Sequence, residues 1–110
     1  MNAESKKLIT ITTVYDNNIH QPTLESDWGF SCVIEHPDAR IMFDTGAKPT
    51  ILENNLKKLH INPTSINYLI ISHKHWDHKG GALWLLAQNP SIIIYTPKTW
   101  SNHLEKKFTY

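Results

Sequence analysis

Length, composition and charge limit what this chain can be. It has 110 residues, which suits one small domain or a piece of a larger one. Its 11 Lys and Arg residues are nearly balanced by 10 Asp and Glu residues and are scattered, whereas nucleic-acid and membrane-surface binders usually concentrate basic residues. The single Cys32 excludes an intrachain disulfide, and no segment approaches the roughly 20 apolar residues of a membrane helix. We therefore expect a cytoplasmic protein that does not contact membranes, and a nucleic-acid partner is disfavoured.

The first half of the chain predicts strands. Residues 8–15 are rich in β-branched and aromatic side chains, which is typical of a strand. The polar segment 16–29 contains proline and glycine, so it predicts a long loop. Residues 30–36 and 40–44 form two more short strands around a Pro-Asp turn, and this pattern predicts a β-hairpin.

The second half alternates helices and strands. Apolar residues at helical spacing predict a helix over 49–60, and nearly unbroken apolar runs over 66–72 and 91–96 predict interior strands covered on both faces. A short buried helix is expected over 82–88, and a last helical pattern runs over about 96–107. The element order predicts a layered α/β (α+β) domain, with a mixed sheet and flanking helices.

Three histidines and an aspartate follow the strand at 66–72. In an extended segment, side chains two residues apart project to the same side, so His73 and His75 can reach one metal ion together. Asp77 continues that alternation, and His78 begins the next element from a different angle. Imidazole and carboxylate are metal ligands, and burying them without partners would be costly. Four donors presented in two directions suit two adjacent metal ions better than one.

This cluster and its surroundings resemble a known signature. The stretch HKHWDH, followed by two glycines, resembles the HxHxDH motif of the metallo-β-lactamase superfamily. The glycine pair Gly80-Gly81 would allow a tight turn and close packing of the next helix. The earlier 42-MFDTG-46 resembles the family's Asp-Thr-Gly at a strand end, and the likeness runs from about Leu8 to about Lys98. A microbial branch related to a dihydropterin ribofuranosylaminobenzene-phosphate synthase is especially similar at 13-TVYDNN-18, 27-DWGFSCVIEH-36, 41-IMFDTGA-47 and 69-LIISHKHWDHKGG-81.

The resemblance implies a role for each residue of the cluster. His73 and His75 would bind a first metal, and Asp77 and His78 a second. Asp77 would also act in catalysis by orienting a metal-bound water or hydroxide. Asp44 would hydrogen-bond near the histidine loop and fix its geometry, although a simple turn aspartate remains an alternative. The implied cofactors are two divalent metal ions, zinc first, with manganese or iron as alternatives.

The family also implies a longer protein. Its members are αββα sandwiches of roughly twice this length, so residues 1–110 are expected to form a single partial domain, the amino-terminal half. A third histidine, a bridging aspartate and a final histidine would come from the other half. The remaining histidines lack the family context of a ligand: His20, His36, His60 and His103. The chain can be part of a longer enzyme, a truncated gene product or one protomer of an assembly, and all three remain open.

Two classes of function are therefore expected to compete. The first is a metallo-hydrolase, in which metal-bound hydroxide attacks an ester or phosphoester-like small-molecule substrate. In the full-length branch, a pterin-related transferase or synthase reaction is an alternative. The second class is a non-catalytic metal-binding or interaction fragment, because the ligand set is incomplete. The apolar runs 66–71 and 91–95 would lie exposed in a half sandwich, which predicts a homodimer or association with a missing half.

Overall fold

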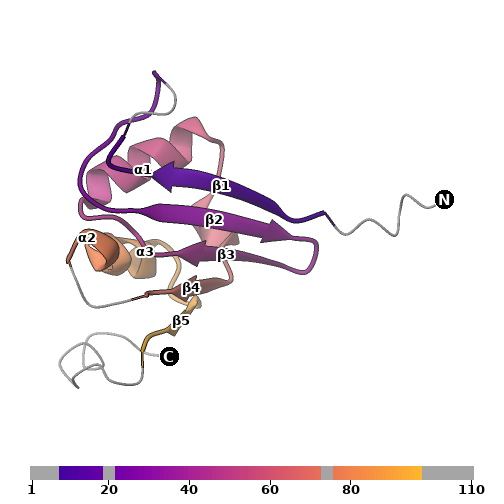
Figure 1. Ribbon diagram of the computed structural model, residues 1–110. Helices are drawn as coiled ribbons and strands as arrows, with labels where there is room; N and C mark the ends of the chain where they lie inside the picture. Colours follow the sequence, from indigo (N-terminus) through magenta and orange to yellow (C-terminus); the bar gives the residue numbers. More distant parts are fainter. Residues whose placement is uncertain (1–7, 19–21, 73–75, 98–110) are drawn as a thin grey trace.

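A mixed β-sheet organises the chain in the computed structural model, which describes residues 8–18, 22–72 and 76–97 (Figure 1). Within these residues the sheet has five strands in the order β1-β2-β3-β4-β5. The strands are β1 Thr10–Tyr15, β2 Ser31–His36, β3 Ala39–Phe43, β4 Tyr68–Ile70 and β5 Ile93–Tyr95. β1, β2 and β3 pair antiparallel, whereas β3, β4 and β5 pair parallel. The predicted hairpin and the predicted mixed layered α/β fold are both confirmed.

Helices connect the parallel strands, as such crossovers require. The longest described helix, α1 Pro49–Lys58, begins with a proline, whose fixed φ and missing N–H suit the first helical turn. After it come the 3₁₀ turn η2 Pro63–Ser65 and, beyond β4, the helices α2 Trp76–Lys79 and α3 Ala82–Gln88. The predicted helices over 49–60 and 82–88 are confirmed, while most of the pattern expected over 96–107 lies outside the described residues. None of the described helices is long and apolar enough to cross a membrane.

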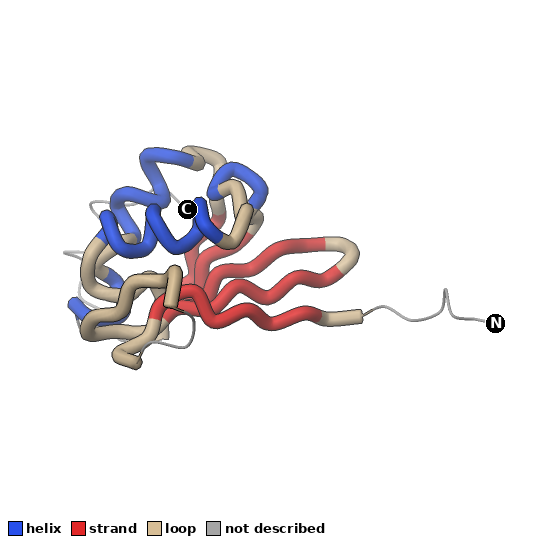
Figure 2. The backbone as a smooth tube through the Cα atoms, turned by 90° about the horizontal axis from the view of Figure 1, so that it is seen from above, coloured by secondary structure: helices blue, strands red, loops and turns tan. Residues whose placement is uncertain are grey.

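The core lies between the sheet and its helices. Val33, Met42, Leu69 and Ile94 form one row across β2 to β5 and are fully buried or nearly so. Apolar side chains of α1 and α3 complete this core: Ile51, Leu52, Leu56, Ala82 and Leu85. Figures 1 and 2 show α1 and α3 on the same side of the strands. The strands at 66–72 and 91–96 were expected to be covered on both faces, but the described residues cover one face, because both crossovers lie on the same side.

Candidate metal centre

The candidate site lies at the edge of the sheet where β3 and β4 end. These two strands are parallel, so the residues that follow them meet at the same edge. Asp44 comes directly after β3, Ser72 lies two residues after the end of β4, and His78 stands in α2. This is the position where α/β sheets usually bind ligands.

Asp44 ties these three segments together. Its Oδ1 accepts a hydrogen bond from the Ser72 backbone N–H at 2.7 Å, and its Oδ2 accepts one from the Ser72 hydroxyl at 2.7 Å. His78 Nδ1 lies 2.7 Å from the same Oδ2. The carboxylate is 1% exposed, and the residue adopts a φ of 59°, a left-handed conformation that aspartate tolerates better than most residues. The hydrogen bonding expected of Asp44 is therefore present, and it fixes one end of the histidine loop.

The contact with Asp44 orients the imidazole of His78. A carboxylate only accepts hydrogen bonds, so neutral His78 donates from Nδ1 and carries its lone pair on Nε2. A histidine that binds metal usually donates its other ring N–H to a carboxylate or carbonyl oxygen in this way, which sets the tautomer and the ring orientation. The His78 side chain is 22% exposed, whereas the Asp44 side chain that it contacts is 1% exposed.

Thr45 joins the same edge to the helices that follow. Its backbone N–H donates to the His78 carbonyl at 2.8 Å, and its hydroxyl oxygen accepts from the Gly81 N–H at 2.9 Å. A Cβ on Gly80 would stand 1.8 Å from the carbonyl oxygen of Ala47. The close packing predicted for the glycine pair is confirmed. Thr45 was missed in the sequence, although its place in the FDTG motif was a usable signal.

The four predicted ligands differ in what the structure describes. His73 and His75 lie outside the described residues, and of Asp77 only the backbone is described. Asp77 was expected to continue an extended alternation, but it lies in α2 beside His78. The backbone of Asp77 is therefore helical rather than extended. Among the described side chains, no group of three or more His, Cys, Asp or Glu residues could hold a metal. The complete ligand set therefore stays a prediction.

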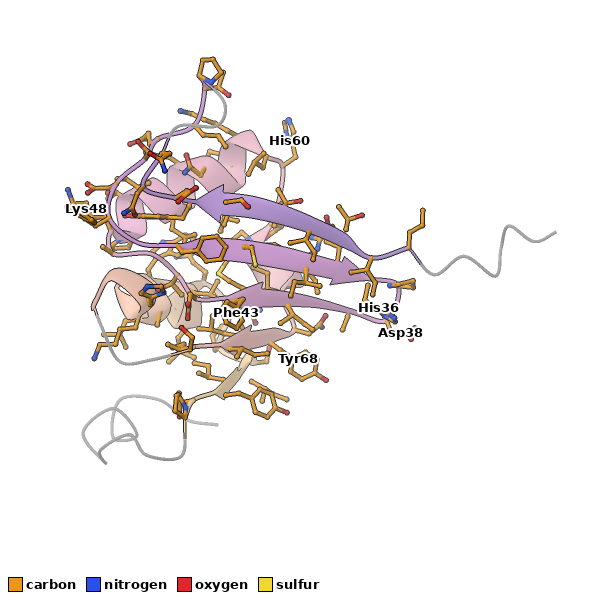
Figure 3. All side chains as sticks on the ribbon, in the orientation of Figure 1. His36, Asp38, Phe43, Lys48, His60 and Tyr68 are labelled. Atoms are coloured by element: carbon orange, nitrogen blue, oxygen red, sulfur yellow. The ribbon has the colours of Figure 1, made fainter. Side chains whose placement is uncertain are left out.

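The other described histidines lie away from this edge. Figure 3 shows His36 and Asp38 at the opposite end of the strands and His60 at the end of α1. His36 Nδ1 accepts a hydrogen bond from the Asp38 backbone N–H at 3.1 Å, which stabilises the hairpin turn. His20 and His103 fall outside the described residues.

A second ionic contact joins Asp27 to Lys48. Lys48 Nζ stands 2.6 Å from Asp27 Oδ2, and the Lys48 backbone N–H donates to the Tyr15 hydroxyl at 3.1 Å. Hydrogen bonding to Lys48 lowers the pKa of Asp27, and the same contact raises the pKa of Lys48. Burial raises the pKa of Tyr15. These contacts hold Asp27 and the end of β1 against the start of α1.

Comparisons with known proteins agree with this arrangement. A family model described as the metallo-beta-lactamase superfamily matches residues 29–108. A 7,8-dihydropterin-6-methyl-4-(beta-D-ribofuranosyl)-aminobenzene-5'-phosphate synthase from Methanocaldococcus jannaschii is 42% identical over 57 residues, which are 51% of this chain and 19% of that protein. A UPF0173 metal-dependent hydrolase from Natranaerobius thermophilus is 38% identical over 69 residues, which are 62% of this chain and 29% of the relative.

A solved structure shows a similar fold. A candidate metallo-beta-lactamase from Thermotoga maritima superposes with a TM-score of 0.62 at 21% identity, over 89% of this chain and 48% of the other. The match extends over most of the sheet and helices described above. This chain spans less than a third of the length of either curated relative and about half of the solved chain.

Proposed function

Because the chain belongs to the metallo-β-lactamase superfamily, we propose that it forms the metal-binding edge of a metal-dependent hydrolase. The observation that carries this proposal is the Asp44 carboxylate, which is buried and bonded to both Ser72 and His78. A buried carboxylate at the end of a parallel strand, aimed at a histidine, is the support that a metal-binding imidazole needs. The name of the Natranaerobius relative, a metal-dependent hydrolase, supports the reaction class.

The donor chemistry of the site fits divalent metal ions. Imidazoles suit zinc and iron, and a carboxylate is a harder ligand that also suits manganese. We propose His73 and His75 as ligands of one ion and Asp77 and His78 as ligands of a second, with zinc as the first choice. Asp44 would not bind metal in this scheme, because hydrogen bonds from Ser72 and His78 already engage its oxygens.

The chain's own residues would bind the metal ions and orient the metal-binding side chains. Asp44 holds His78 by its Nδ1, which leaves Nε2 as the ligand atom, and Thr45 holds the backbone of α2 through the His78 carbonyl. Asp77 is proposed to orient the attacking water as well as to bind metal. The metals, when bound, supply Lewis acidity, which makes water a stronger nucleophile and stabilises negative charge on the substrate oxygen.

The proposed substrate is a small molecule with an ester or phosphoester-like bond. A second candidate, for a complete protein of this branch, is a pterin-related synthase or transferase reaction. The name of the Methanocaldococcus relative, a synthase of a pterin compound that carries a phosphate, favours it. A non-catalytic metal-binding fragment is the alternative for the chain by itself, since a catalytic metal needs a fuller set of protein ligands.

Metal binding by designed variants tests the site. We expect equilibrium dialysis with zinc or manganese to show weaker binding in His75→Ala and His78→Ala, and roughly 10- to 100-fold weaker binding in Asp44→Asn. His36→Ala is the matched control, because it removes an imidazole at the opposite end of the strands. Metal binding that is unchanged in all three site variants would refute the assignment.

Turnover separates the hydrolase from the fragment. The purified chain is incubated with zinc or manganese and a p-nitrophenyl ester or phosphodiester, and product is followed by absorbance. Turnover that disappears in His75→Ala but persists in His36→Ala supports the hydrolase. Metal binding without turnover supports the non-catalytic fragment.

A further inference from the structure

The turn that carries Asp44 has an uncommon backbone conformation. Asp44 and Gly46 both lie in the left-handed region, with φ of 59° and 71°. Glycine adopts such a conformation at little cost, whereas a residue with a side chain keeps it only where the surrounding structure holds it there. In this conformation the Asp44 carboxylate bonds both Ser72 and His78. The direction of the carboxylate therefore depends on the contacts that hold residues 44–46, which we call the Asp44 turn.

Ser31 holds the Asp44 turn at its first residue. β2 and β3 are antiparallel and Cys32 pairs with Phe43, so Ser31 stands opposite Asp44 at the start of β2 (Figure 1). The Ser31 hydroxyl donates to the Asp44 carbonyl oxygen at 2.7 Å, and Ser31 is 0% exposed. A buried carbonyl that loses its donor is costly, because solvent does not readily replace the lost hydrogen bond. The hydroxyl therefore fixes the peptide that follows the Asp44 side chain.

Two further contacts hold the other end of the turn. The Phe30 carbonyl oxygen, next to Ser31, accepts a hydrogen bond from the Gly46 N–H at 3.0 Å. Tyr15 closes the turn from β1, since a Cβ on Gly46 would stand 2.4 Å from its ring. Two consecutive residues at the start of β2 thus bond the first and last residues of the Asp44 turn. The contact of Ser31 comes from a side chain, so a substitution can remove it and leave the backbone bonds in place.

We propose that Ser31 is a positioning residue for the candidate metal centre, because its buried hydroxyl holds the Asp44 peptide in the conformation that aims the carboxylate at His78. Without this hydroxyl, the Asp44 peptide can rotate toward the right-handed or extended conformations that residues with side chains prefer, and the carboxylate then turns away from His78. Ser31 acts through Asp44 and not by touching metal. This role rests on the proposed function, since it gives the aim of the His78 ring its purpose in binding metal.

The proton on the His78 ring reports whether Asp44 is held. With the Asp44 carboxylate as acceptor, the neutral ring carries its proton on Nδ1 and has its lone pair on Nε2. When the carboxylate turns away, the proton can move to Nε2, and that tautomer has no lone pair on the proposed ligand atom. Ser31→Ala should therefore lower the population of the Nδ1–H tautomer and weaken zinc binding about 10-fold.

Heteronuclear NMR of the isotopically labelled, metal-free chain tests this role at about pH 8.5, where imidazole is neutral. Long-range proton–nitrogen spectra show which ring nitrogen of His78 is protonated, and its signals are assigned by their absence from His78→Gln. We expect mainly the Nδ1–H tautomer in the unmodified chain and a shift toward the Nε2–H tautomer in Ser31→Ala.

The matched control is Asn89→Ala. It also removes a buried side chain that donates to a backbone carbonyl, that of Ile66 at 2.7 Å, but this contact lies before the start of β4, at the end of the strand opposite the site. We expect a comparable loss of stability in urea denaturation, with the His78 tautomer and the zinc affinity of the unmodified chain. A merely structural role of Ser31 would leave the tautomer unchanged in both variants.

A folded Ser31→Ala variant that keeps the His78 tautomer of the unmodified chain would overturn the proposal. An equal change of tautomer in Asn89→Ala would do the same. If Ser31→Ala does not fold, Ser31→Cys decides by the same spectra, because it fills the position with a much weaker donor.

The two measurements separate this role from the proposed function. An unmodified chain that binds neither zinc nor manganese in dialysis would count against the proposed function, whereas the metal-free spectra would still support or overturn the hold of Ser31 on Asp44. Weaker zinc binding in His75→Ala, together with an unchanged tautomer in Ser31→Ala, would leave the proposed function standing and overturn the role of Ser31.

Discussion

The two faces of the sheet are built from neighbouring residues of the same strands, yet their environments are opposite. Ile94 is 2% exposed and Ile93, the residue before it, is 44% exposed. The same contrast separates Leu69 from Tyr68, which is only partly buried. A continuous apolar run indicates that both faces of a strand need cover. It does not say which part of the chain, or which other molecule, covers each face.

The contrast has a thermodynamic meaning. Burying a large apolar side chain contributes about 1.5–3 kcal/mol to folding, so the row of Val33, Met42, Leu69 and Ile94 stabilises the fold itself. Side chains on the opposite face, such as Ile93, can contribute a similar gain only when another surface covers them. Substitutions on the helix side should therefore affect folding more than substitutions on the opposite face.

Ile94→Ala should have the largest effect on folding. It removes a buried side chain next to the helices, and we expect the free energy of unfolding to fall by about 2–5 kcal/mol. Urea denaturation followed by circular dichroism measures the change. Ile93→Ala at the same low protein concentration is the matched control, since it makes the same substitution one residue away on the other face. Equal losses in both variants would show that the two faces are not distinct.

Asn55→Ala should have the next largest effect. The buried Asn55 amide donates to the Val14 and Glu25 carbonyls, and its oxygen accepts from the Glu25 N–H, so it joins α1 to β1 and the 16–29 loop. Leaving these buried groups without partners should cost about 1–3 kcal/mol. Thermal melts of Asn55→Ala and of the exposed neighbour Asn54→Ala test this, and the second variant should change stability by about 0.5 kcal/mol or less.

Ile93→Ala should have a small effect. The side chain is 44% exposed among the described residues, so we expect the free energy of unfolding to fall by about 0.5 kcal/mol or less. Urea denaturation followed by circular dichroism measures the change. A loss as large as that of Ile94→Ala would contradict this prediction.

The ion pair of Asp27 and Lys48 should have the smallest effect, and it should depend on pH. The pKa of Asp27 is lowered in the folded chain, so its contribution is present above the ordinary aspartate pKa of about 3.9 and is lost as the pH falls through the lower folded value. The pKa of Lys48 is raised, so its contribution is present below about 10.4 and is lost as the pH rises through the higher folded value. Asp27→Asn should therefore melt slightly below the unmodified chain at neutral pH, and the difference should shrink as the pH falls through the acid range. A difference that stays the same as the pH falls would point to packing rather than charge.

Local patterns in the sequence were sufficient for most of the secondary structure that the described residues show. The helix predicted at 49–60 and the hairpin predicted at 30–44 both depend on residues close together in the chain. The metal cluster after the strand at 66–72 stays a prediction. Side-chain periodicity, proline and glycine act over these short distances, so they are readable without the fold. The FDTG motif likewise indicated that Asp44 supports the histidine loop.

Tertiary structure alone decided how distant segments meet. Asp44 and His78 are 34 positions apart, and parallel pairing of β3 with β4 brings the Asp44 carboxylate to the His78 ring. The bond between Thr45 and Gly81, and the contact of Gly80 with Ala47, likewise need α2 and α3 to pack on the end of β3. Both crossovers fall on one side of the sheet, so one apolar face became the core, and the described residues leave the other face partly exposed. The hydrophobic pattern could not distinguish the two faces, because burial depends on which surface another element covers, whereas the pattern records only that the side chains are apolar.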